Sequence, residues 1–206
     1  MPDWGPPNWD DDSPQLRQNL ARVLKEIVRA SEQRRTPTLA QARRWHTLIM
    51  ERLDVPDPRF VGVFRGDPGL ENLQVQVGEN YGVDSATVAD QLRAFEAKLQ
   101  TLVIELDALL PPGQEPDADQ LAAIVDLCGW AHAEWVRIHP FANGNGRTAR
   151  LWSNSLAMRY GLPPFIRLRP RSNAGYANAG AQAMQGNWKP TATVFRRLLE
   201  DLLDVP

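Results

Sequence analysis

Helical spacing of apolar residues, interrupted repeatedly by prolines and glycines, runs through most of this sequence of 206 residues. Apolar residues that recur every three or four positions line one face of a helix, and that face needs a core to pack on. The 17 prolines and 14 glycines fall mainly between these segments, where such residues end helices. The spacing therefore predicts helices over residues 14–31, 38–53, 85–106, 117–138, 143–161, 176–184 and 191–203.

Residues 60–83 have a different pattern. Two short alternating apolar runs, 60–64 and 73–77, are separated by a loop rich in Gly, Pro, Asp and Asn. This alternation is typical of paired strands, so we expect a β-hairpin here. The fold class that follows is mainly helical, all-α with one small β-hairpin, in a single domain over residues 15–206. Residues 1–14 are expected to form an irregular arm, pinned by Trp4 and Trp9.

Composition excludes several classes of protein. The 23 Lys and Arg residues are balanced by 25 Asp and Glu residues, so dedicated nucleic-acid binding is disfavoured. The single cysteine, Cys128, excludes an intramolecular disulfide framework and a cysteine-based zinc cluster. The sequence has neither a secretory signal pattern nor an apolar run of membrane-spanning length, which predicts a soluble, cytoplasmic protein. Whether it forms a homo-oligomer is left open.

The segment His-Pro-Phe-Ala-Asn-Gly-Asn-Gly-Arg-Thr-Ala-Arg over residues 139–150 joins two predicted helices by a tight turn. Its glycines, Gly144 and Gly146, stand where the second helix exposes its first backbone N–H groups, which attract phosphate. Arg147 and Arg150 lie three positions apart in the first turns of that helix, and guanidinium groups bind phosphate oxygens well. The segment therefore predicts an anion site.

His139 stands across this turn. A histidine that titrates near neutrality is suited to take a proton from an attacking hydroxyl group. Together with the predicted anion site, it indicates phosphate-ester chemistry.

The same segment resembles the signature of Fic domains, HPFx(D/E)GNGRxxR. It matches at eight specified positions: His139, Pro140, Phe141, Gly144, Asn145, Gly146, Arg147 and Arg150. Upstream, Val-Gly-Val-Phe-Arg over residues 61–65 looks like the Gly-x-Tyr/Phe-Arg segment that enters the hairpin called the flap in this family, here expected over residues 60–83. The resemblance covers roughly residues 38–203.

This resemblance implies a protein adenylyltransferase that moves AMP from Mg²⁺-bound ATP to a Ser, Thr or Tyr hydroxyl and releases pyrophosphate. His139 would be the general base, and Gly144, Asn145 and Gly146 would bind the phosphates. Arg147 would hold the β-phosphate and Arg150 the γ-phosphate, while Pro140 and Phe141 would shape the turn. We also expect the flap to dock a target protein by adding a strand, with Leu73 and Val75 as contact residues.

One specified position departs from the signature, because Asn143 replaces the acidic residue that binds Mg²⁺. An amide oxygen can ligate Mg²⁺ but brings no negative charge, so weaker metal binding is expected; Asn143 is also a favoured helix N-cap. Three alternatives stay open: a slower AMP transferase, a transferase that uses another nucleotide or phosphate-linked donor, and a non-catalytic nucleotide-binding interaction module. Gly146 disfavours the kinase-like branch of the family, which has lysine near this point.

No inhibitory helix with the family's (S/T)xxxE(G/N) pattern is evident in the sequence. A separate small, antitoxin-like protein could supply the glutamate to Arg150, which would make this chain a toxin, or regulation works otherwise.

Overall fold

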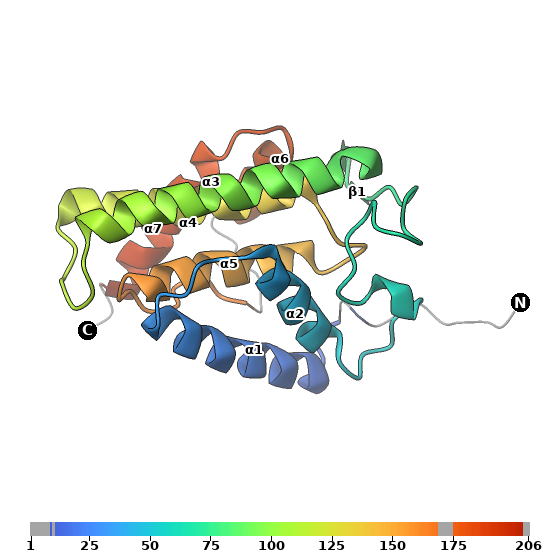
Figure 1. The fold of residues 1–206 in the computed structure, drawn as a ribbon, viewed down its shortest axis with the longest axis horizontal. Coiled ribbons are helices and arrows are strands. Elements are labelled where there is room, and N and C mark those ends of the chain that lie inside the picture. Colours follow the sequence, from blue (N-terminus) through green and yellow to red (C-terminus); the bar gives the residue numbers. More distant parts are fainter. Residues whose placement is uncertain (1–8, 10, 169–174, 204–206) are drawn as a thin grey trace, which may run out of the picture.

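The computed structural model describes residues 9, 11–168 and 175–203 (Figure 1). Within these ranges, the chain forms seven α-helices, two 3₁₀ turns and one two-stranded antiparallel sheet. The helices are α1 (Pro14–Glu32), α2 (Leu39–Met50), α3 (Val88–Leu109), α4 (Ala118–Ile138), α5 (Asn145–Arg159), α6 (Tyr176–Met184) and α7 (Lys189–Leu203). The 3₁₀ turns are η1 (Pro58–Phe60) and η2 (Ser85–Thr87), and the strands are β1 (Gln76–Val77) and β2 (Asn80–Tyr81). The predicted fold class, mainly helical with one small hairpin, is confirmed.

Local sequence signals set the ends of the long helices. The Ser13 hydroxyl accepts a hydrogen bond from the Leu16 N–H, and Pro14 occupies the first turn of α1, where its missing N–H costs nothing. Asp117 and Gln120 form a reciprocal capping box at the start of α4. Each of these signals involves only residues a few positions apart, so the helix positions could be predicted from the sequence.

Helix α4 lies at the centre of the domain and contacts α3, α5, α6 and α7. Helix α5 lies between α4 and α1 (Figure 1). Trp135 of α4 and Trp152 of α5 are fully buried, and the indole N–H of Trp135 donates to Thr148 Oγ1 of α5 at 2.9 Å. Aromatic packing and this hydrogen bond hold together the two helices that flank the 139–144 turn. Cys128 of α4 is also buried.

The hairpin prediction was wrong in its extent. Residues 60–64 do not form a strand, and the pairing is confined to β1 and β2, with Gln76 opposite Tyr81 and Val77 opposite Asn80. The first run is broken because Gly62 adopts a left-handed φ of 72°, which removes it from extended geometry. In addition, Phe64 is buried in the helical core. We keep the name flap for residues 60–83 and use hairpin for residues 76–81.

The N-terminal arm can be described only in part. Trp9 packs against Phe60 with ring centroids 5.8 Å apart, whereas Trp4 lies outside the described residues. No helix in the described ranges has the length and apolar character needed to cross a membrane.

The contact between α4 and α7 depends on a glycine. A Cβ atom on Gly129 would lie 2.7 Å from the Cα of Ala192, and a backbone atom cannot yield as a flexible side chain can. Gly129→Ala is therefore expected to lower the free energy of unfolding by about 1–3 kcal/mol, measured by urea denaturation followed by circular dichroism.

The matched control is Gly180→Ala in α6. A Cβ there would meet nothing within 4 Å, so removing a helix-interior glycine is expected to raise the free energy of unfolding by about 0.5–1 kcal/mol. Equal effects of the two substitutions would contradict the close contact of α4 with α7.

Candidate active site

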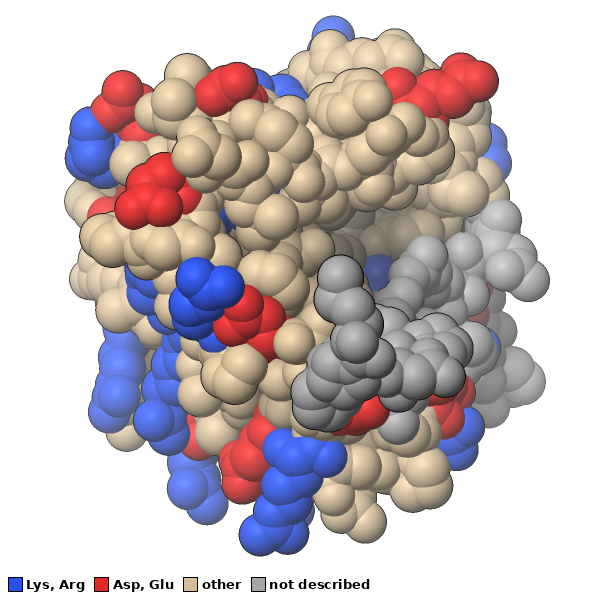
Figure 2. Space-filling model, turned by 90° about the vertical axis from the view of Figure 1, so that its right-hand side faces the viewer, with Lys and Arg blue, Asp and Glu red and all other residues tan. Residues whose placement is uncertain are grey.

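A cavity of about 840 Å³ opens at the end of the molecule that carries the hairpin. Its walls come from the hairpin, the end of α4, the 139–144 turn, the start of α5 and one face of α6. Figure 2 looks onto this end and shows a hollow with basic atoms at its bottom. Among the described lining residues, Arg147 and Arg150 carry positive charge and Glu79 carries the single carboxylate. The cavity is therefore suited in size and sign to an organic anion.

His139 lies in the wall of this cavity, directly after the last residue of α4. It adopts a left-handed conformation with φ 54° and ψ 56°, which is uncommon for a non-glycine residue and needs support from its surroundings. Its Nδ1 lies 3.0 Å from the Val136 carbonyl oxygen. A carbonyl can only accept, so Nδ1 carries the proton and the neutral ring has its lone pair at Nε2.

The environment keeps this ring neutral. Burial lowers the pKa of His139 below its usual value, and the positive charge of Arg65 acts in the same direction. A lowered pKa means that the proton is lost at a lower pH, so Nε2 is available as a base at neutral pH.

Phe141 and Asn145 fix the turn that follows. The Phe141 ring is fully buried and stacks on His46 with centroids 3.9 Å apart. Asn145 Oδ1 accepts from the Phe141 N–H, and its Nδ2 donates to the Phe141 carbonyl, both at 2.8 Å. The Pro140 carbonyl accepts from the Arg65 N–H at 2.7 Å. The turn is thus anchored by both its side chains and its backbone.

Gly144 is the N-cap of α5 and adopts a left-handed φ of 78°. A Cβ at this position would lie 2.9 Å from Met50 Cε and 3.2 Å from His46 Nε2, so glycine is required by both conformation and space. After it, the first N–H groups of α5 have no acceptor one turn back and point along the helix axis. The start of α5 is therefore open at the N–H groups of Asn145 and Gly146, and anion binding there stays a prediction.

Asn143 does not present a free oxygen to the cavity. Its Oδ1 accepts a short hydrogen bond from the Gly144 N–H and lies 3.4 Å from Arg147 Nη2. The Asn143 side-chain oxygen therefore stabilises the turn and lies beside the positive charge of Arg147. Among the described residues, no group of three His, Cys, Asp or Glu side chains could hold a metal ion.

The two predicted arginines are both buried and both line the cavity. Arg147 donates from Nη1 to the Trp9 carbonyl at 2.8 Å, so the N-terminal arm contacts this site. Arg150 donates from Nη1 to the Tyr176 hydroxyl at 3.1 Å, and its buried Nε has no acceptor among the described residues. No described carboxylate pairs with Arg150. The expected external inhibitor that would provide one stays a prediction.

Tyr176 of α6 is a site residue that the sequence reasoning missed. Its hydroxyl lies 2.6 Å from His132 Nε2 as well as within reach of Arg150. Burial, and then the charge of Arg150, lower the pKa of His132 to about 3, so His132 is neutral. The Tyr176 hydroxyl thus links Arg150 to a neutral histidine. Tyr176 is 26 positions beyond Arg150 in the chain, and no local motif marks it.

His46 of α2 connects the flap to the turn. Its Nδ1 accepts from the Gly62 N–H at 2.9 Å, and its Nε2 donates to the Asn143 carbonyl at 3.0 Å. Burial lowers the pKa of His46 to about 3, so it stays neutral. His46 is therefore a hydrogen-bonded core histidine.

The two flap residues expected to contact a target have different positions. Val75 lines the cavity, and its carbonyl accepts from the Gly82 N–H at 3.0 Å. Leu73 is not among the lining residues, and its carbonyl accepts from Arg65 Nη1 at 3.2 Å.

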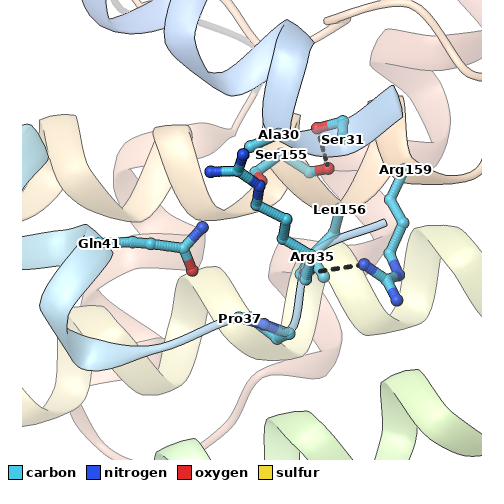
Figure 3. A pocket seen from close by; sticks show the side chains of 8 residues that line it. All are labelled: Ala30, Ser31, Arg35, Pro37, Gln41, Ser155, Leu156 and Arg159. Carbon is cyan, nitrogen blue, oxygen red and sulfur yellow. Dashed lines mark hydrogen bonds between the residues drawn. The ribbon is translucent and has the colours of Figure 1, made fainter. Parts of the chain in front are cut away.

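A second hollow lies between the end of α1 and α5 (Figure 3). It has room for about 10 Å³ of solvent, which is roughly one water molecule. Arg159 in its wall donates to the Arg35 carbonyl at 2.9 Å and pairs with Asp107. With room for about one water molecule, and with Arg159 already paired, this hollow is too small to be a candidate ligand site.

The site therefore consists of a neutral histidine and two buried arginines beside the N-terminus of a helix, in a mainly helical domain. A model of the Fic/DOC family matches residues 36–157, which is more than half of the chain. The chain belongs to the Fic/DOC family, and the resemblance seen in residues 139–150 is confirmed.

Among curated relatives, the protein adenylyltransferase Fic of Nematostella vectensis is 38% identical over 80 residues, which are 39% of this chain and 18% of that protein. The match therefore spans less than a fifth of the relative's length.

Solved structures share the fold. A Fic domain containing signaling protein from Bacteroides thetaiotaomicron superimposes with a TM-score of 0.65 at 19% identity, covering 92% of this chain and 69% of that one. BepC from Bartonella tribocorum with bound AMPPNP gives a TM-score of 0.55 at 16% identity, covering 94% and 90%.

Proposed function

We propose that this chain is a protein adenylyltransferase that moves AMP from Mg²⁺-bound ATP to a hydroxyl group of a target protein. The observation that carries the proposal is the unprotonated Nε2 of His139 in the wall of an arginine-lined cavity at a helix N-terminus. Curated relatives are named protein adenylyltransferase Fic, and a similar fold binds the ATP analogue AMPPNP. Both findings support ATP as the donor.

In the proposed step, the target hydroxyl oxygen attacks the α-phosphorus of ATP. The new O–P bond forms while the bond from the α-phosphorus to the bridging oxygen of pyrophosphate breaks. Nε2 of His139 takes the hydroxyl proton, and pyrophosphate leaves with the electron pair of the broken bond. The protein contributes position and charge stabilisation, which dominate catalysis in phosphoryl transfer.

Gly144, Asn145 and Gly146 would receive the phosphates at the start of α5, with Arg147 on the β-phosphate and Arg150 on the γ-phosphate. Support comes from the burial of both guanidinium groups beside the cavity, because a buried cation gains most from an anionic partner. To bind phosphate through Nη1, Arg147 would exchange its hydrogen bond to the Trp9 carbonyl.

Mg²⁺ enters this proposal only as part of the Mg²⁺–ATP substrate. The residues around Asn143 fit a protein-held metal poorly, because the amide oxygen is engaged by Gly144 and faces Arg147. The substrate phosphates would hold the ion, and Asn143 would be at most a weak ligand.

The direct test is label transfer to protein in a cell lysate with Mg²⁺, using ATP labelled at the α-phosphate or at the γ-phosphate. Only the α-label is expected to appear on protein. His139→Ala should reduce transfer at least about 100-fold, because it removes the general base, while calorimetry shows unchanged binding of an ATP analogue.

Transfer of the γ-label alone would instead indicate a kinase. Binding without transfer, unaffected by His139→Ala, would favour the second candidate, a nucleotide-binding interaction module. The engaged oxygen of Asn143 is the observation that favours this second candidate.

A carboxylate at position 143 tests the role of the amide. Asn143→Asp keeps the acceptor for the Gly144 N–H and adds the charge that Mg²⁺ ligands usually carry. The Mg²⁺ concentration for half-maximal transfer is expected to fall about tenfold, measured by titrating Mg²⁺ at fixed ATP.

Asn80→Asp is the matched control, since Asn80 also lines the cavity but lies on the hairpin. An equal gain in both variants would mean a general effect of charge. Loss of activity in Asn143→Asp alone would mean that the amide itself is required beside Arg147.

We propose that the target docks as an added strand on the hairpin. Gln76 supports this docking mode, because Val75 is bonded to Gly82 and alternate residues of a strand direct their backbone groups to opposite edges. The N–H and carbonyl of Gln76 therefore point to the outer edge, where an extended segment can pair. Val75 would contact the target with its side chain from the cavity wall.

Gln76→Pro removes the outward N–H and leaves the hairpin bonds in place, so target modification is expected to fall about tenfold, measured as initial rate at low target concentration. Gln76→Ala is the control: it also removes the side-chain bond to the Gly78 carbonyl but keeps the N–H. Equal rates for the two variants would exclude strand addition at this edge.

A further inference from the structure

Arg65, in the flap, is the most heavily bonded side chain near the site, and none of the chemistry above uses it. It is 1% exposed, and no carboxylate among the described residues forms an ion pair with it. Its guanidinium instead donates to four main-chain carbonyls: His139 at 2.7 Å, Val83 at 2.8 Å, Ile138 at 2.9 Å and Leu73 at 3.2 Å. Burying a charge in this way is costly, so the arrangement requires a reason.

Two of the four acceptors belong to the end of α4. The carbonyls of Ile138 and His139 have no N–H partner further along the helix, because the helix ends there. Arg65 satisfies both and brings positive charge to the negative end of the α4 dipole. It thereby supports the left-handed conformation of His139, which is unfavourable without such contacts.

The other two acceptors belong to the flap. Leu73 precedes the hairpin and Val83 follows it, so these two segments are the incoming and outgoing arms of the flap. One guanidinium therefore ties both arms to the end of α4. The backbone N–H of Arg65 also donates to the Pro140 carbonyl at 2.7 Å, directly after His139. Arg65 therefore connects the flap directly to His139 and Pro140, in addition to the link that His46 makes between Gly62 and Asn143.

Gly82 provides an independent observation of the same junction. A Cβ atom there would lie 2.7 Å from His139 Cβ, 2.8 Å from Arg65 Nη2 and 3.3 Å from the Ile138 carbonyl. Its φ is not in the left-handed region, so close approach is what requires glycine. The outgoing arm of the flap rests directly on His139.

We propose that Arg65 is the positioning residue for His139, holding the imidazole in its reactive orientation and coupling that orientation to the seating of both flap arms. This inference rests on the proposed function of His139 as the base. Arg65 touches no reacting atom and acts through His139 alone. A target strand that pairs with the flap would then stabilise the same junction that orients the base.

A purely structural Arg65 would affect folding but leave the imidazole of the folded protein unchanged. The distinguishing readout is ¹⁵N NMR of the histidine rings, which reports tautomer and titration for each of the three histidines, with His139→Gln used for assignment. It needs no activity, so the result stands even if AMP transfer is not observed. Transfer assays then give kcat and KM separately.

Arg65→Gln is expected to move His139 from the Nδ1-protonated tautomer to a mixture and to raise its titration midpoint by at least about 0.5 unit, because a nearby positive charge is lost. The kcat should fall about 10- to 100-fold, the range expected when a catalytic group is displaced by about an ångström, with ATP-analogue binding within about twofold of the unmodified chain. Arg65→Lys should keep the titration midpoint but still lose kcat, since one ammonium cannot reach all four carbonyls.

Arg43→Gln is the matched control. Arg43 also holds the flap, because it donates to the Gly62 carbonyl at 3.1 Å and pairs with Asp67. Neither of these contacts involves His139. Its loss should leave the His139 signals unchanged. The other titratable and charged groups that line the cavity are His132, Tyr176, Arg147, Arg150 and Glu79, and all are present in every variant.

An Arg65→Gln chain that is folded and shows native His139 tautomer and titration would overturn the proposal. If that variant fails to fold, Gly82→Ala provides the second test, since its methyl group presses on both Arg65 and His139. Changed His139 signals there support the coupling, and unchanged signals refute it.

Discussion

The turn between α4 and α5 joins the aromatic core to the open cavity within a few residues. The rest of the site depends on how firmly this turn is anchored in the core. Phe141 is inserted into the core and stacked on His46, while Asn145 bonds both backbone groups of Phe141. With the turn held from inside, the N–H groups at the start of α5 and the imidazole of His139 can face the cavity without local collapse. The indole of Trp135, bonded to Thr148, keeps the two helices at the spacing that this requires.

Neutral histidines recur around this turn for a common electrostatic reason. Burial lowers the pKa of His46, His132 and His139, and the buried arginines make a further positive charge unfavourable. Two of these rings serve as fixed hydrogen-bonding links, to the Asn143 carbonyl and to Tyr176. In His139, Nδ1 is bonded to the Val136 carbonyl, and Nε2 has no hydrogen-bond partner among the described residues. The same burial thus keeps all three rings neutral, and His139 alone is the proposed base.

The helices and the turn at residues 139–144 could be predicted from the sequence because their signals are local. Capping residues, the apolar spacing and the glycines of residues 139–150 act over a few positions, and helix α5 begins where those glycines indicated. The extent of the hairpin could not be predicted in this way. An alternating run looks like a strand regardless of whether its central glycine adopts a left-handed φ, as Gly62 does, and that choice depends on the bond from Gly62 to His46 of another helix.

The contacts missed by the sequence are those made across long separations or to carbonyl groups. Tyr176 reaches Arg150 only because α6 packs against α4. The pattern over residues 61–65 includes Arg65, but it does not predict the contacts of this side chain, because its four closest acceptors are main-chain oxygens, which every residue carries. A motif can mark which side chain is present, but it cannot mark the point where a helix ends and leaves carbonyls to be satisfied. In this domain His139, the proposed base, lies at such a point, and the carbonyl groups left by the end of α4 are bonded by Arg65 of the flap.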